Sequence, residues 1–304
     1  MNSSGVFAAA PMGTGTGGQG VGGQIGRGPG PNTSNGTVGA AGMSGTNGAG
    51  ASNAGGFFSG QTYFGDTTGI GRITRNAATV TTNWCVLTNG TVENQMLLRG
   101  SLCWDRTGVW SNHLVGVTSG NLNGGTDPAL KGVWRVDAQG QPTLITQIET
   151  SHLEGVITLP NDTNKFGPWA GKIITGDEEA SPVALIYMIS PNGVVTTNDS
   201  TQLFPDGIYT EDFEIIPTNQ DLFACDPDAG LVVKLPASYF TNHIGDLLIN
   251  QAGEANVPAA LFILHWNSGL AGFETLRITY RRPNGSIGHF EHVAFAPINI
   301  PPLH

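Results

Sequence analysis

Short apolar runs separated by turn sequences fill the chain from residue 61 onward. Typical runs are LVGV (114–117), ALIYMI (184–189) and LRITY (276–280). Gly, Pro, Asn and Asp gather between the runs, as in Pro191-Asn-Gly193. Strands this short, closed by such turns and without a helical period, are typical of antiparallel sheet. The pattern predicts an all-β region over residues 61–304.

Two sequence elements recur along this region. The first is an eight-residue pattern that aligns without gaps in LEGVITLP (153–160), TEDFEIIP (210–217) and FEHVAFAP (290–297), with a degenerate copy in LRGSLCWD (98–105). The second has copies in NHLVGV (112–117), GKIITGDEE (171–179) and GDLLINQAG (245–253), and we expect it to form the strand beside the first. A repeat of roughly 40–57 residues with about four strands is the spacing of a β-propeller blade.

The repeats therefore predict a β-propeller with five or six blades. A β-sandwich is the alternative, but it does not account for gapless eight-residue repeats. We expect the last copy, at 291–296, to pair with strands from residues 61–88 and so to close the ring without an open edge.

Residues 1–60 differ from the rest in composition. They contain 20 of the 45 glycines, and Arg27 is their only charged residue. Such a tract is typical of a flexible tail. A second interpretation follows from a period of three, which suits a closely packed extended helix or a strand added to another subunit. The glycines in this period are Gly36, Gly39, Gly42, Gly45 and Gly48. The sequence thus predicts a glycine-rich arm over 1–60, serving assembly or acting as a linker, followed by the propeller over 61–304.

Charge and composition limit the classes of partner. Charged residues make up 12% of the chain, and the formal net charge is −10. A nucleic-acid-binding protein needs a basic face, so this balance argues against nucleic acid. No stretch approaches the ~18 uncharged apolar residues of a membrane helix, which argues against a membrane span. Low charge with many Thr, Asn and Gly residues resembles secreted proteins and indicates an extracellular or cell-surface location.

The eight-residue repeat places three glutamates at equivalent points. Glu154, Glu211 and Glu291 share one repeat position, and a closed propeller would bring them to one mouth of its channel. Carboxylates gathered in this way repel one another unless a cation lies among them, and Ca²⁺ accepts such oxygen ligands. The alternative is a structural network in which Arg99 neutralises the glutamates, joined by Asp212 and His292. No catalytic residues are predicted.

The three cysteines lack the spacing of a metal site. In an exported protein, Cys85 and Cys103 are the expected disulfide pair because they fall in adjacent predicted blades. The alternative, three buried reduced cysteines including Cys225, stays open.

Taken together, several segments resemble a known family. DRTGVW, HLEGVITLPND, GPWAGKIITGDEE, EDFEIIP and FEHVAFAP look like a family of largely uncharacterised secreted bacterial β-propeller proteins over about residues 95–300. A more distant similarity is to gluconolactonase/regucalcin-like and NHL propellers. The metal-dependent lactonases of that group hold a divalent ion in the channel with Glu, Asn and Asp side chains. Only Glu154 matches their Glu-Gly motif, so the resemblance implies a propeller without a defined activity.

Two functional classes follow. In the first, the chain is a non-catalytic extracellular structural protein that self-assembles through its glycine-rich arm into a fibre or sheath. In the second, it is a Ca²⁺-dependent, lactonase-like hydrolase or a ligand-binding propeller. The arm favours the first class, because a catalytic propeller has no use for such a tract.

Overall fold

The computed structural model describes residues 8–11, 61–66, 69–74, 79–87, 101–118, 131–148, 153–177, 185–198, 203–204, 207–253 and 257–297. Almost all regular structure in these residues is β-strand. The strands up to residue 160 are β1 (Ala8–Pro11), β2 (Gln61–Asp66), β3 (Gly69–Thr74), β4 (Thr79–Val86), β5 (Leu102–Trp104), β6 (Leu114–Thr118), β7 (Gly132–Val136), β8 (Pro142–Gln147) and β9 (Leu153–Thr158).

The later strands are β10 (Ile173–Asp177), β11 (Ile186–Ile189), β12 (Val195–Asn198), β13 (Thr210–Ile215), β14 (Gln220–Asp226), β15 (Leu231–Leu235), β16 (Leu247–Gln251), β17 (Ala260–Asn267), β18 (Gly272–Thr279) and β19 (Val293–Pro297). The described ranges also contain the short helical segments α1 (Thr163–Phe166), η3 (Gly167–Trp169) and η4 (Ala237–His243). In the described part of the chain, no helix has the length and apolar character needed to cross a membrane.

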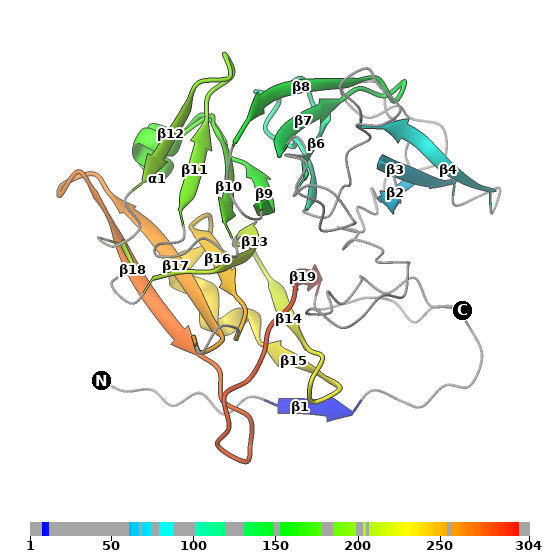
Figure 1. Cartoon of the computed structure of the whole chain (residues 1–304). Helices are drawn as coiled ribbons and strands as arrows, with labels where there is room; N and C mark the ends of the chain where they lie inside the picture. The colour runs from blue at the N-terminus through cyan, green and yellow to red at the C-terminus, as the bar shows by residue number, and fades with distance from the viewer. Residues whose placement is uncertain are drawn as a thin grey trace. The chain divides into compact units, whose positions relative to one another are not determined.

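The chain divides into two compact units, whose strands are labelled in Figure 1. The central unit, residues 22–210, holds the sheets β2-β3-β4, β5-β6-β7-β8 and β9-β10-β11-β12. The terminal unit joins residues 1–21 to 211–304, and holds the sheets β13-β16-β17-β18 and β1-β15-β14-β19. Antiparallel sheets of four strands are the blades of β-propellers, and the fold is of this type.

Both sequence repeats fall on equivalent strands. The eight-residue repeat forms an edge strand of each four-stranded sheet, namely β5, β9, β13 and β19. The second element forms the adjacent strands β6, β10 and β16. The prediction of a repeated unit, with the second element beside the first, is therefore confirmed.

The predicted partner of the last strand is wrong. β19 pairs with β14, from Gln220↔Pro297 to Ala224↔Val293, rather than with strands from residues 61–88. In the sheet β9-β10-β11-β12, the repeat strand β9 pairs with the next strand in the chain. The repeat at 210–217 forms β13, which pairs with β16 and not with the next strand, β14. The hairpin β14-β15 therefore needs an edge strand from elsewhere in the chain. β19 occupies that edge, and the C-terminal repeat thus completes a sheet that begins at residue 220.

The other edge of this sheet is occupied by residues from the predicted arm. β1 pairs antiparallel with β15 through Ala8↔Lys234, Ala9↔Val233, Ala10↔Val232 and Pro11↔Leu231. Within the terminal unit, β1 is the part of residues 1–60 that the structure describes. The glycines of the period of three, Gly36 to Gly48, lie outside the described residues.

Apolar faces of successive sheets pack against each other within each unit. In the central unit, Cys85 of the first sheet joins Leu114 and Trp134 of the second in one buried cluster. The opposite face of the second sheet contributes Val115 and Val133 to a cluster with the sheet β9-β10-β11-β12. In the terminal unit, a third cluster joins both sheets. A strand alternates its side chains between two faces, which is why neighbouring residues such as Leu114 and Val115 enter different cores.

Candidate functional site

The predicted glutamates occupy the beginnings of edge strands. Glu211 in β13 and Glu291 just before β19 lie in the terminal unit, and their exposed fractions are 1% and 6%. Glu154 lies in β9 of the central unit, where it is half-buried and opposite Gly176 of β10. Nε2 of His289 lies 3.1 Å from Oε1 of Glu291. The structure thus gives Glu291 an imidazole neighbour that the sequence pattern did not indicate.

Asp212 and His292 meet across two sheets of the terminal unit. Nδ1 of His292 lies 3.1 Å from Oδ2 of Asp212, and the same oxygen accepts a hydrogen bond from the backbone N–H of Val293 at 3.0 Å. Asp212 is in β13, and His292 directly precedes β19. The contact therefore ties together the beginnings of two edge strands. Arg99, the third member of the predicted channel network, lies outside the described residues.

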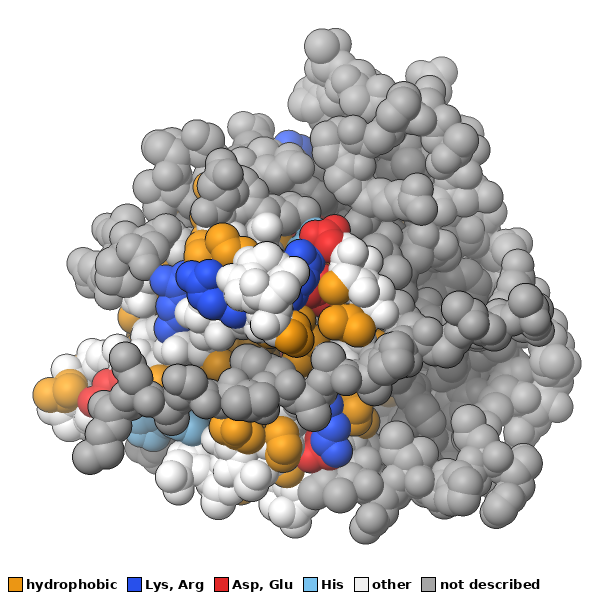
Figure 2. Space-filling view, turned by 90° about the horizontal axis from the view of Figure 1, so that it is seen from below, with side chains coloured by type: hydrophobic (Ala, Val, Ile, Leu, Met, Phe, Trp, Pro, Cys, Tyr) orange, Lys and Arg blue, Asp and Glu red, His pale blue; other side chains and the backbone are white. Residues whose placement is uncertain are grey.

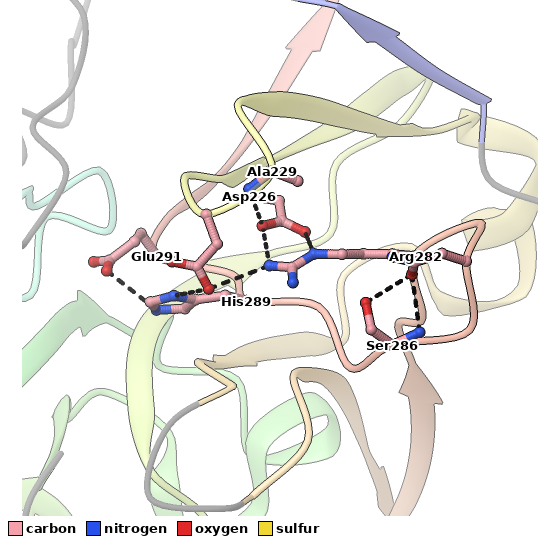
Figure 3. A network of polar contacts seen from close by, with 8 residues as sticks. Asp226, Ala229, Arg282, Ser286, His289 and Glu291 are labelled. Carbon is pink, nitrogen blue, oxygen red and sulfur yellow. Dashed lines mark hydrogen bonds and ion pairs between the residues drawn. The ribbon is translucent and has the colours of Figure 1, made fainter.

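A second network joins the β14-β15 turn to the segment between β18 and β19 (Figure 3). Nε and Nη2 of Arg282 donate to the two carboxylate oxygens of Asp226 at 2.8 and 2.6 Å. Asp226 has no exposed surface, and it also accepts from the backbone N–H of Ala229 at 3.2 Å. Two parallel bonds between a guanidinium and a carboxylate hold both groups in one plane. Arg282 thus fixes the segment that leads into β19.

The same network continues to Glu291. Nη2 of Arg282 lies 3.2 Å from Oδ2 of Asp228, and Nδ1 of His289 lies 3.4 Å from that oxygen. His289 in turn contacts Glu291, as Figure 3 shows. Asp226-Pro-Asp228 begins a hairpin turn, as turn-forming residues of this kind indicate, and the N–H of Gly230 donates to the carbonyl of Pro227. Its role as the partner of Arg282 was missed, because 54 to 56 residues separate the paired groups.

Burial, charge and hydrogen bonding shift the pKa values of several groups in this network, and the pairing with Asp226 raises the pKa of Arg282 above its ordinary value. Burial opposes ionisation of Asp226, but the hydrogen bonds from Arg282 and Ala229 outweigh it and hold the pKa of that carboxyl below its ordinary value. Burial beside Asp226 raises the pKa of Tyr280 to about 12. Burial, with the charges of Glu291 and Asp226, also raises the pKa of the Cys225 thiol. Arg282 and Asp226 are therefore an ion pair across the ordinary pH range, and Tyr280 is a neutral phenol.

A third cluster borders a surface hollow. Nδ1 of His243 lies 3.2 Å from one carboxylate oxygen of Asp246, and Nδ1 of His265 lies 3.0 Å from the other. Asp246 is only 1% exposed. The hollow has a volume of about 320 Å³ and is lined by Asn242, His243, Ile263, His265, Glu274, Thr275 and Leu276. The sequence pattern gives no signal for this cluster, because strand pairing brings His265 to Asp246 from 19 residues away.

All three cysteines are free thiols in the structure, so the expected Cys85–Cys103 bond is not formed. Cys85 is buried in the cluster around Trp134, whereas Cys103 packs against the cluster on the other face of its sheet. The two cysteines lie in different sheets, Cys85 in β4 and Cys103 in β5, but their side chains enter different buried clusters. Burial and the charge of Asp137 raise the pKa of Cys85 to about 12, which keeps that thiol protonated.

The calcium hypothesis stays a prediction. Within the described ranges, no group of three or more His, Cys, Asp or Glu side chains is arranged to hold a metal ion. Glu211 and Glu291 share the terminal unit, and Glu154 belongs to the central unit. The residues closest to a built site are therefore the Asp226–Arg282 network and the hollow beside Asp246.

The chain matches no protein-family model, and no curated protein resembles it significantly in sequence.

Proposed function

We propose that this protein is a non-catalytic structural protein of the cell surface or extracellular space. It assembles with copies of itself, through the segment that precedes residue 61, into a fibre or sheath. The pairing of β1 with β15 carries this proposal. Support for the location comes from the small share of charged residues, 12%.

The edge of β15 is suited to receive a strand from another chain. In three other sheets, the outer strand follows its neighbour directly in sequence, as β8 follows β7, β12 follows β11 and β18 follows β17. The outer strand beside β15 comes instead from Ala8–Pro11. Without it, β15 would present unpaired N–H and C=O groups, which is the edge to which extended peptides add. The completing strand is therefore the one most easily supplied by a neighbour.

The chain between β1 and the rest is long enough for exchange. Between Pro11 and Gln61 lie 49 residues, which span at most about 160 Å when fully extended. A neighbouring subunit can therefore offer its own residues 8–11 to β15 with the same four residue pairs. When subunits exchange β1, every backbone hydrogen bond of the β1-β15 ladder is kept. The equilibrium between monomers and assemblies therefore depends on protein concentration, as in domain swapping.

The composition of residues 1–60 suits close contact between chains. With Arg27 as their only charge, neighbouring copies do not repel one another. Glycine at every third position from Gly36 to Gly48 permits a close approach of backbones. On the face drawn in Figure 2, by contrast, hydrophobic side chains lie among charged and polar ones. The strand edge thus offers a more specific contact than that face.

We further propose that residues 61–304 form one propeller of five blades, with β2-β3-β4 as the fifth sheet. Ordering the arm costs about 1–2 kcal/mol per residue in conformational entropy, which repeated contacts between arms must offset. The arms would therefore lie inside the polymer, and the propellers on its outside.

A disulfide trap tests the exchange of β1. Ala10 and Val232 lie opposite each other, so cysteines at these two positions can form a bond wherever β1 pairs with β15. The double variant Ala10→Cys, Val232→Cys is made together with Cys225→Ser, because Cys225 of β14 lies on the other side of Val232 and would compete for the new thiol. At high concentration under mild oxidation, we expect covalent dimers and larger species on a non-reducing gel. The controls are the wild-type chain, which reports on the native cysteines, and the single variant Ala10→Cys. If the double variant yields only cross-linked monomers at every concentration, and the wild type shows no polymers by electron microscopy, the proposal is wrong.

A further inference from the structure

The hollow beside Asp246 has a defined chemical character, and its histidines are held in one tautomer. A carboxylate only accepts hydrogen bonds, so Nδ1 of His243 and Nδ1 of His265 both carry the proton in their contacts with Asp246. In the neutral rings, Nε2 is then the acceptor. When the two imidazoles that line the hollow are neutral, each therefore presents Nε2 as an acceptor.

The sequence places these groups together by strand register. Leu247 of β16 lies opposite Leu264 of β17, so Asp246 and His265 are next in the same register. His243 ends η4, and the turn to Asp246 passes through Gly245 at φ 82°, a conformation that glycine adopts without strain. Helical segment and sheet therefore bring one histidine each to the two oxygens of Asp246.

The β17-β18 ladder supplies the remaining walls. His265 pairs with Glu274 and Ile263 pairs with Leu276, so all four side chains lie on one face of the hairpin. The amide of Asn267 donates to Oε1 of Glu274 at 2.9 Å and orients that carboxylate. One wall of the hollow is therefore anionic, and another is apolar.

The charges near the hollow favour a cation. Asp246 and Glu274 are carboxylates, and the neutral imidazoles add two acceptors. Besides these groups, η4, β16, β17 and β18 carry Tyr239 and Arg277 as their titratable side chains. Arg277 pairs with Phe262 on the opposite face, with its guanidinium carbon 5.5 Å from the ring centre. Basic groups are thus directed away from the hollow.

From this arrangement we infer that the hollow binds a small primary alkylammonium compound. The ammonium group donates hydrogen bonds to Nε2 of His265, to Nε2 of His243 and to the carboxylate of Glu274. Its alkyl stem lies against Ile263 and Leu276. A volume of about 320 Å³ is the size of a small organic molecule rather than of a bare metal ion. The binding site is independent of the proposed assembly, since none of its residues contacts β1 in the β15 ladder.

Calorimetric titration of the full chain with n-butylammonium chloride at pH 8 tests the assignment. We expect saturable binding with a dissociation constant on the order of millimolar for so small a ligand. Glu274→Gln removes one exposed charge and raises this constant about three- to fivefold. Asp162→Asn removes an exposed carboxylate elsewhere, retains the oxygen that caps α1, and leaves binding unchanged.

His265→Gln removes the Nε2 acceptor of one ring, so we expect this variant to bind butylammonium more weakly than the wild-type chain. Neutral n-butanol must not bind, since it carries no charge. The assignment is overturned if butanol binds equally, if Glu274→Gln has no effect, or if Zn²⁺ binds here while butylammonium does not.

Discussion

At the scale of single residues, buried carboxylates carry most of the polar structure in the terminal unit. Asp226 and Asp246 are fully or almost fully buried, and each is held by two or more donors. A buried carboxylate without partners is costly, so the residues that satisfy it constrain the backbone around it. Arg282 does this for the segment before β19, and the two histidines do it for the start of β16.

The Asp226–Arg282 pair leads to a prediction about stability. Arg282→Met keeps the volume of the side chain but leaves a buried carboxylate without its cation, so we expect unfolding to become easier by about 3 kcal/mol at pH 7. The neighbouring variant Arg281→Met is the control. Arg281 is exposed and donates to the carbonyl of Gly285, so its loss should cost less than about 0.5 kcal/mol. Denaturant unfolding measures both effects.

The pH dependence of this difference has a defined sign. The pKa of Asp226 is lower in the folded chain than its ordinary value, so the pair stabilises the fold above about pH 4 and loses this effect as the pH falls further. We therefore expect the gap between wild type and Arg282→Met to be largest near neutrality and to shrink in acid. A gap that stays constant from pH 7 to pH 3 would contradict this assignment.

Cysteine chemistry gives a second residue-scale prediction. When the chain is unfolded without a reducing agent, a thiol assay should detect three thiols per chain, since all three cysteines are free. In the folded chain Cys85 should react most slowly with iodoacetamide, because it is 1% exposed and its pKa is raised to about 12. Peptide mapping after brief alkylation reads this order. If only one thiol is titrated per unfolded chain, two cysteines form a disulfide, and the predicted Cys85–Cys103 bond is then supported.

At the scale of elements, the sequence predicted what local patterns determine and failed where distant segments meet. The eight-residue repeat identified β9, β13 and β19 as equivalent strands, because burial of one sheet face repeats the same apolar positions. The partner of β19 was not predictable in this way, since the hydrophobic pattern of an edge strand suits several free edges equally. Likewise, turn residues located Asp226-Pro-Asp228, but nothing local pointed to Arg282.

The edge position of β19 predicts its importance for folding. Deleting residues 289–304 removes β19 from β14 and takes away Glu291 and His292. We expect a lower melting temperature and a broader transition, because the edge of β14 and the cluster around Val293 are then exposed. Calorimetry of the truncated chain checks this. Melting as cooperative and at the same temperature as the full chain would contradict the role of β19 in completing its sheet.

The repeated glutamates predict a response to calcium. If Glu154, Glu211 and Glu291 share an ion, saturating Ca²⁺ stabilises the folded state by roughly 3 kcal/mol at one hundred times the dissociation constant, which raises the melting temperature by about 5 °C or more. Glu154→Gln should abolish the rise, and Asp162→Asn should not. Identical melting curves in chelator and in excess Ca²⁺ would assign these residues to a structural network with Arg99.

At the scale of the whole molecule, residues 8–11 link the fold to the proposed assembly. Two modes of assembly remain distinct: addition of β1 to β15 of a neighbour, and bundling of the glycine period from Gly36 to Gly48. Deleting residues 1–11 removes β1 and keeps the glycine period, whereas deleting residues 1–56 removes both.

We expect both truncated chains to be folded monomers by circular dichroism and sedimentation, because strand addition supplies the backbone hydrogen bonds that hold subunits together. A synthetic peptide of residues 1–11 should bind either truncated chain at the vacant edge of β15, and block assembly of the full chain when added in excess. Polymers formed by the chain lacking residues 1–11, but not by the chain lacking 1–56, would assign assembly to the glycine period and leave β1 as a strand of its own subunit.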